Sequence, residues 1–173
     1  IRLSLVGSEM CIRDRIHTTR MTHCFALAHL QGIAGYDALV DHGIVALQGK
    51  LRDEVAGGWF ADARRSGDKS AYLHAFVALA ASSAQAAGRP GAEALLAEAI
   101  RIVETHFWSE EEGALRESFS RDWSQEEPYR GANSNMHGVE AFLALADVTG
   151  NSIWLQRALR IVCLLYTSPS PRD

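Results

Sequence analysis

The sequence predicts an all-α fold, a toroid of repeated helix pairs. Residues 25–47, 76–103 and 142–162 each open with an Ala- and Leu-rich run, break at a turn, and resume with apolar residues at helical spacing. The turn within each pair is short, whereas the connections between pairs are long and polar. Antiparallel pairs joined in this way would place every long loop at one end. An open α-solenoid is the alternative, but its connections are usually shorter and more uniform.

Glycine or proline marks the turn within each pair. Glycine readily adopts the left-handed conformation that follows a helix, and proline cannot continue one. In chain order, such turns fall at Gly32 and Gly35, at residues 88–91 and at Gly150. The helix after each turn is indicated by apolar spacing, as at Leu155, Leu159 and Val162 in the third pair.

Two long loops connect the pairs, at residues 52–69 and 108–132. Connections beyond about 12–15 residues are usually functional or disordered in compact domains. Flat aromatic rings suit the apolar faces of sugars. The loops carry the aromatic residues Trp59, Phe60, Trp108, Phe119, Trp123 and Tyr129. These rings either contact a sugar or plug the end of the helix bundle as a minor core.

Composition excludes several classes of protein. The 173 residues suit one domain or a piece of one, and 47% are hydrophobic, which is enough for a core. The chain has 17 basic and 21 acidic residues, so a broad basic surface for nucleic acid is not expected. No apolar run reaches the roughly 18 residues of a membrane span. We therefore expect no nucleic-acid or membrane partner. Because residues 1–15 lack the pattern of a signal peptide, a cytoplasmic location is the default expectation.

The two ends of the chain do not continue the helical patterns beside them. Residues 1–15 (IRLSLVGSEMCIRDR) and 163–173 (CLLYTSPSPRD) resemble translated sequencing-adapter read-through, which is set aside before a fold is interpreted. The alternative is a genuine apolar N-terminal segment and a Ser/Pro tail. We expect residues 16–162 to form the domain and the natural chain to extend beyond it. The one cysteine inside it, Cys24, is predicted to be buried.

Seven histidines are candidates for chemistry. No two of them are three or four residues apart, so HExxH and HxxxH metal pairs are absent. His137 and Glu140 are three apart, which alone is a weak metal signal. The sequence therefore predicts neither a metal site nor a cofactor.

Three polar clusters precede the repeated apolar runs by a similar distance, at residues 20–23 (RMTH), 72–76 (YLHAF) and 133–137 (NSNMH). Each would lie near the start of the first helix of its pair, at the long-loop end. Asn133 and His137 are four residues apart and can share a helix face. The candidate site residues in these clusters are Arg20, Tyr72, Asn133 and His137.

Each candidate also has a structural interpretation. Asn133 could cap its helix, a common use of Asn, and His137 could be a hydrogen-bonded core residue. Arg20 could form a surface ion pair, and Tyr72 could belong to the core. Different polar residue types at equivalent repeat positions favour a functional site.

Together, the motifs at residues 20–30 (RMTHCFALAHL), 57–60 (GGWF), 71–80 (AYLHAFVALA) and 133–141 (NSNMHGVEA) resemble the N-acylglucosamine 2-epimerase superfamily. Within it, the chain is most similar to the aldose–ketose isomerase branch of D-mannose and sulfoquinovose isomerases. The resemblance covers essentially all of residues 16–162. The three polar motifs in this order are fairly specific, whereas any one alone would be weak.

The resemblance implies an (α/α)6 barrel with a sugar pocket at the loop-rich end. About half of this barrel would be present in the chain. By the same resemblance, His137 would be catalytic, and Arg20, Tyr72 and Asn133 would bind substrate. Later helices would carry two further catalytic histidines, so we expect the chain alone to be inactive.

Histidine acid/base chemistry suits sugar isomerisation. A base removes the acidic proton beside the carbonyl of an opened aldose and leaves a cis-enediolate. Return of the proton to C1 gives the ketose, and return to the opposite face of C2 gives the epimer. The ordinary pKa of histidine, about 6.5, lies near working pH. We predict a fragment of an aldose–ketose isomerase acting on a mannose-type monosaccharide. The alternatives are a 2-epimerase of N-acylglucosamine or a β-1,4-linked disaccharide, and a non-catalytic helical-repeat binding module.

Overall fold

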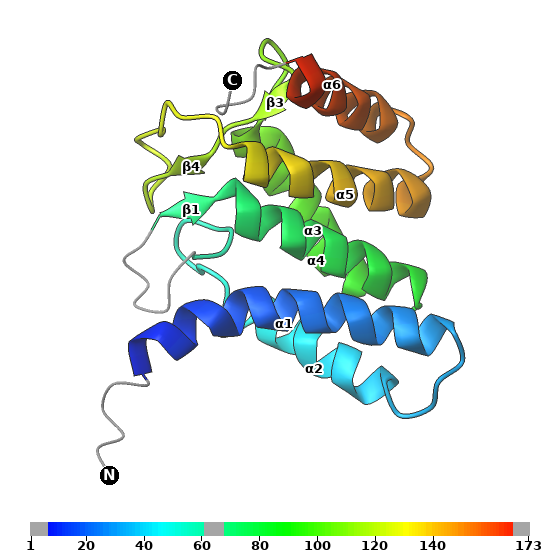
Figure 1. The fold of residues 1–173 in the computed structure, drawn as a ribbon. Helices are drawn as coiled ribbons and strands as arrows, with labels where there is room; N and C mark the ends of the chain where they lie inside the picture. Colours follow the sequence, from blue (N-terminus) through cyan, green and yellow to red (C-terminus); the bar gives the residue numbers. More distant parts are fainter. Residues whose placement is uncertain (1–6, 61–67, 168–173) are drawn as a thin grey trace.

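Within residues 7–60 and 68–167, which the computed structural model describes, the chain forms three helical hairpins (Figure 1). Residues 1–6 and 168–173 of the predicted tails, and residues 61–67 of the first long loop, lie outside the described residues. The helices in this part are α1 (Gly7–Leu30), α2 (Asp37–Gln48), α3 (Ala71–Ala86), α4 (Ala92–Ile102), α5 (Ala132–Thr149) and α6 (Ile153–Thr167). The predicted all-α class and the three helix pairs are confirmed.

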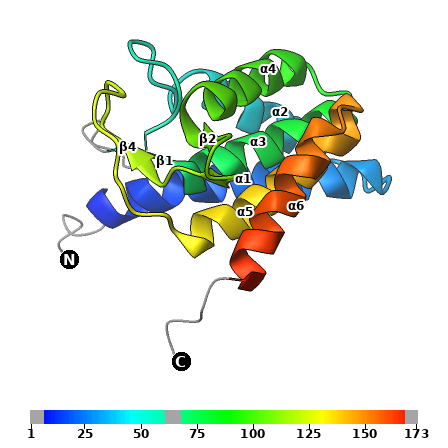
Figure 2. The same ribbon diagram turned by 90° about the horizontal axis from the view of Figure 1, so that it is seen from above.

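The first helices of the pairs, α1, α3 and α5, lie side by side and run in the same direction (Figures 1 and 2). Each packs against the helix that follows it in the chain. Helix α3 contacts both α1 and α5 and is buried along most of its length. Its many alanines let the neighbouring helices approach closely. All three helices begin at the end where the loops gather, as the alternation of short and long connections predicted.

The turns within the pairs fall where the glycines predicted them. Gly150 ends α5 in the left-handed conformation, with φ of 67°, and its N–H donates to the carbonyl of Ala146. Gly91 adopts the same left-handed conformation, with φ of 78°, directly before α4. At the other end, the hydroxyl of Ser70 accepts from the N–H of Leu73 and caps α3.

Two short antiparallel ladders order the long loops. In them, β1 (Lys69–Ser70) pairs with β4 (Ser118–Phe119), and β2 (Trp108–Ser109) pairs with β3 (Ala114–Leu115). A π-helical turn, Val103–Phe107, joins α4 to β2. The loops are therefore more regular than the sequence predicted.

Most of the loop aromatics belong to the core. Trp59, Phe60, Trp108 and Phe119 are buried. Trp123 is half-buried, and Tyr129 is 63% exposed. For the four buried rings, the prediction of a minor core at the loop end is confirmed.

Helices α1 and α6 extend past the predicted domain limits at residues 16 and 162, since α1 begins at Gly7 and α6 ends at Thr167. The prediction that Cys24 is buried is wrong, because its side chain is exposed on α1. Among the described helices, α1 packs mainly against α2 and α3, and its Met21, Leu27 and Leu30 side chains are exposed. None of the described helices combines the length and the apolar character needed to cross a membrane.

A buried ion pair closes the first long loop. Lys69 Nζ lies 2.9 Å from Asp53 Oδ2 and also donates to the carbonyl of Gly57. Asp53 Oδ1 accepts from the N–H groups of Val55 and Ala56, at 3.0 and 3.3 Å. The two ends of the loop are thereby held together by charge-assisted bonds, which are stronger than neutral ones.

The environment acts on both charges of this pair. Burial works to raise the pKa of Asp53, but hydrogen bonds from Lys69 and the backbone, with the charge of Lys69, hold it below its ordinary value. Burial lowers the pKa of Lys69, and Asp53 offsets only part of this effect. Lys69 therefore depends on Asp53 to remain charged, whereas Asp53 also has the Arg121 guanidinium at 3.5 Å.

We expect Asp53→Ala to destabilise the chain by about 3–5 kcal/mol, because it leaves the Lys69 ammonium buried without its counter-ion. The double variant D53A/K69M should recover part of this loss, since it removes both charges. Urea unfolding followed by circular dichroism measures both changes. An unchanged unfolding midpoint for D53A would show that the pair contributes nothing to stability.

Candidate functional site

Arg20, Tyr72 and His137, from α1, α3 and α5, converge near the starts of α3 and α5. Arg20 Nη2 donates to the Tyr72 hydroxyl at 2.8 Å, and its guanidinium lies 4.4 Å from the ring centre of Phe76. The His137 ring meets the Tyr72 ring edge-on at 5.2 Å and lies 4.7 Å from that of Phe76. We call Arg20, Tyr72 and His137 the site cluster.

Asn133, the fourth candidate, lies one turn before His137 on α5 and is exposed. Because the two residues are four apart, they share a face of the helix. Gly131 occupies the cap position of α5, so the capping interpretation of Asn133 is wrong. Its position is therefore one turn nearer the loop end of α5 than His137.

Glu117 holds the starts of α3 and α5 together. Its backbone carbonyl accepts from the N–H of Ala71, the first residue of α3, at 2.8 Å. Its carboxylate accepts from the N–H of Gly131 at 3.1 Å and from the hydroxyl of Ser134 at 2.7 Å. A negative charge at a helix N-terminus is also favoured by the helix dipole. Glu117, which lies between Tyr72 and His137 in the chain, thus positions the starts of the two helices that carry them.

Asn135 fixes α5 to the adjacent hairpin. Its side-chain oxygen accepts from the N–H of Leu115 at 2.8 Å, and its amide nitrogen donates to the carbonyls of Leu115 and Gly131. The buried side chain therefore pairs with Leu115 as a strand backbone would. The second Asn of the N-S-N motif, Asn135, is structural, whereas the first, Asn133, is exposed.

His137 is neither a core residue nor fully exposed. Its Nδ1 lies 2.8 Å from Glu140 Oε2, one turn further along α5, and 15% of its side chain is exposed. The interpretation as a hydrogen-bonded core residue therefore holds in part, because the ring is hydrogen-bonded but not fully buried. An imidazole held by a carboxylate and still accessible suits proton transfer.

His74, in the second motif, has a structural role. Its Nε2 accepts from the N–H of Trp59 at 3.1 Å, and its Nδ1 donates to the carbonyl of Ser70 at 2.7 Å. Burial lowers the pKa of His74 to about 3. Both nitrogens are used by backbone groups, so this imidazole stays neutral and holds the Gly57–Phe60 turn on α3.

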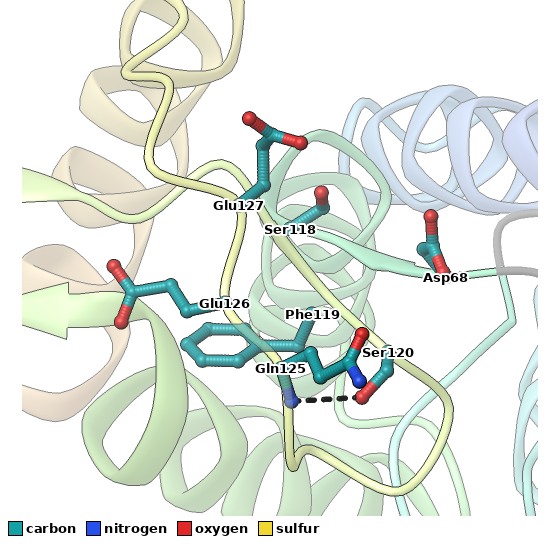
Figure 3. Close-up of a pocket in the computed structure, with 7 residues that line it drawn as sticks. All are labelled: Asp68, Ser118, Phe119, Ser120, Gln125, Glu126 and Glu127. Atoms are coloured by element: carbon teal, nitrogen blue, oxygen red, sulfur yellow. Dashed lines mark hydrogen bonds between the residues drawn. The ribbon is translucent and has the colours of Figure 1, made fainter.

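A separate polar cavity of about 140 Å³ lies beside the β1–β4 ladder (Figure 3). Its lining residues are Asp68, Ser118, Phe119, Ser120, Gln125, Glu126 and Glu127. Glu126 is paired with Arg116 and Arg130, and Ser120 accepts from the N–H of Gln125. Because no residue of the site cluster lines this cavity, we assign it no part in the candidate site. Among the described residues, no group of three or more His, Cys, Asp or Glu is placed to hold a metal ion.

Sequence reasoning missed the residues that support the site cluster. Glu140 was noted only as a weak metal signal with His137, although the i, i+3 spacing also suits a hydrogen bond between a carboxylate and an imidazole. Glu117 had no local signal, because its partners lie on two other elements. Ser83, which meets His23 at 2.6 Å, was hidden within an Ala/Ser-rich run.

Comparison with known proteins gives consistent results. The family model of N-acylglucosamine 2-epimerase (GlcNAc 2-epimerase) matches residues 7–169. A D-mannose isomerase of Pseudomonas cannabina pv. alisalensis is 67% identical over 150 residues, which cover 85% of this chain and 36% of that protein. The chain therefore spans little more than a third of that relative's length.

Solved structures share the fold. A crystal structure of D-mannose isomerase superposes with a TM-score of 0.77 at 33% identity, covering 85% of this chain and 40% of that one. The cellobiose 2-epimerase from Spirochaeta thermophila also gives 0.77, at 22% identity, covering 88% and 43%. The helix pairs are thus arranged as in part of these α/α barrels, as predicted.

We expect Glu117→Ala to destabilise the chain by about 0.5–2 kcal/mol, the usual cost of losing a helix cap. Amide hydrogen exchange over residues 132–137 should accelerate, because the start of α5 loses its acceptor. Glu111→Ala is the control, since it removes an exposed carboxylate from the turn between β2 and β3. Equal exchange at α5 in E117A and E111A would show that Glu117 does not hold this helix.

Proposed function

Because the chain belongs to the N-acylglucosamine 2-epimerase family, we propose that it is part of a sugar isomerase that interconverts a mannose-type aldose and its ketose. The convergence of Arg20, Tyr72 and His137 carries this proposal. A helical-repeat module without catalysis would have no need to bring a cation, a phenol and an imidazole together from three helices. The likeness to proteins named D-mannose isomerase supports mannose as the substrate.

We propose that residues 16–162 form the N-terminal half of an (α/α)6 barrel and that residues 1–15 and 163–173 are not native. In the complete enzyme, later helices would supply two further histidines as the main acid and base. The chain alone would then bind part of the sugar and catalyse nothing. The cytoplasmic location stays a prediction.

The site cluster suits an enediolate mechanism. The base removes the proton from C2 of the opened aldose, and the electron pair moves to the carbonyl oxygen. Arg20 and Asn133 would donate to the two enediolate oxygens, an electrostatic stabilisation that needs no reorganisation during the reaction. Tyr72 would bind a sugar hydroxyl, and His137 would assist ring opening or hold the O1/O2 end. Return of the proton to C1, with transfer of the O2 proton to O1, gives the C2 carbonyl and completes the isomerisation.

The completed reading frame, expressed as one protein, should interconvert mannose and fructose without added metal and retain this activity in EDTA. The 173-residue chain should show no turnover and should associate, because its apolar helix faces are incompletely covered. Chromatographic product analysis checks the activity of both proteins, and gel filtration checks the association of the 173-residue chain. Glucose from mannose without fructose would favour the 2-epimerase alternative, and EDTA inactivation reversed by a divalent cation would contradict the metal-free mechanism.

In the complete enzyme, His137→Ala should lower turnover by about 10²–10⁴-fold, the usual contribution of a positioned acid or base. The fold should be retained, because the His137 side chain is partly exposed and bonds to an exposed carboxylate. Steady-state kinetics and thermal unfolding separate the two effects. Wild-type turnover in a folded variant would remove His137 from the mechanism.

A further inference from the structure

Three histidines of the described chain, His23, His74 and His137, lie on the helices that carry the site, and their ring nitrogens have different partners. A neutral imidazole has one nitrogen that donates and one that accepts, and the partner of either nitrogen decides which is which. In His74 the backbone uses both nitrogens. In His23 and His137 the recorded hydrogen bond within the described residues is to Nδ1 alone.

The hydroxyl of Ser83 decides the tautomer of His23. Ser83 donates its single proton to the carbonyl of Leu79 at 3.0 Å. The same oxygen lies 2.6 Å from His23 Nδ1, and with its proton directed at Leu79 it accepts there from a protonated Nδ1. Burial lowers the pKa of His23, partly offset by the charge of Glu140, so the ring is neutral at neutral pH. The lone pair of this ring is therefore on Nε2.

A carboxylate decides the tautomer of His137 in the same way. Ionised Glu140 has no proton to give, so the 2.8 Å contact of its Oε2 with His137 Nδ1 requires a proton on Nδ1. The lone pair of neutral His137 is then on Nε2. Carboxylates behind catalytic histidines hold the ring in this manner in other enzymes.

His23, Ser83 and Glu140 form a layer that lies deeper along the three helices than the site cluster. His23 follows Arg20 by three residues on α1, and Glu140 follows His137 by three on α5. On α3, Ser83 follows Phe76 by seven residues and shares its helix face. The layer thus continues the surface on which Arg20, Phe76 and His137 already meet.

We propose that Ser83 and Glu140 are positioning residues that hold His23 and His137 in the tautomer protonated at Nδ1. Both histidines then present the Nε2 lone pair as a proton acceptor to hydroxyl groups of the sugar. The tautomers are inferred from the Ser83 and Glu140 contacts, whereas their use on a sugar rests on the proposed function. His23 thereby joins the site as a second acceptor, and His74 does not.

Nitrogen-15 spectra of selectively labelled histidines in the 173-residue chain test the tautomers, since protonated and unprotonated ring nitrogens resonate far apart. They are recorded well above the ordinary histidine pKa of about 6.5, in solution or from sedimented protein in the solid state. We expect a protonated Nδ1 and an unprotonated Nε2 for both His23 and His137. A protonated Nε2 in either wild-type residue would overturn the proposal for that residue.

Variants assign each tautomer to its partner. In Glu140→Gln the amide can donate as well as accept, so the two nitrogen signals of His137 should move toward each other while those of His23 stay apart. Ser83→Ala should do the same to His23 and leave His137 unchanged. Asp147→Asn removes an exposed carboxylate two turns further along α5 and should change neither. Unchanged His137 signals in E140Q would overturn the role of Glu140.

A turnover measurement links the tautomer to chemistry. In metal sites, losing the group behind a histidine costs about 10- to 100-fold in affinity or activity, and we expect a similar loss of turnover for E140Q in the complete enzyme, with D147N unaffected. Full turnover in E140Q would overturn the positioning role. Absence of isomerase activity in the unmutated complete protein would instead overturn the proposed function, and the tautomer result would stand.

Discussion

The hydrogen bonds of Glu117 set where the candidate site can form. The residue lies in a loop, yet its carbonyl bonds to the first residue of α3 and its carboxylate to the first turn of α5. A side chain at position 131 would overlap the Glu117 carboxylate, so Gly131 is required for this approach. Helix α1 joins the same place through the bond from Arg20 to Tyr72. The relative heights of the three helices, and therefore the meeting of the site cluster, depend on these few polar contacts.

The helix pairs could be predicted because local sequence decides them. Apolar spacing over about three turns and a glycine at the turn are sufficient to mark a helical hairpin, as at Gly150 between α5 and α6. The site cluster was found by comparing the starts of the repeats. That comparison brought three residues together because α1, α3 and α5 run in the same direction, although Arg20 lies in the middle of α1 and not near its start as expected. The capping interpretation of Asn133 was wrong, because Gly131 occupies the N-cap position of α5.

The loops resisted prediction because distant residues hold them. Trp123 has φ of 66°, a conformation in which bulky residues are outliers. Its indole N–H donates to the carbonyl of Ala56, and its ring stacks on His106 at 3.8 Å. These contacts join segments 17 to 67 residues apart, and no local pattern indicates them. The exposure of Cys24 has a similar cause, because it depends on which helices cover α1 rather than on the sequence around it.

Spacing from a site residue on the same helix decides which histidines can do chemistry. His74 lies two residues after Tyr72, and residues two apart do not face each other on a helix. Its ring therefore turns away from the site cluster into the loop core, where Trp59 and Ser70 use both nitrogens. His23 lies three residues after Arg20, and His137 four after Asn133, so both share a face with a site residue. A motif such as Y-x-H therefore does not by itself identify a catalytic histidine, because the partner of each ring nitrogen determines whether a lone pair remains for a substrate.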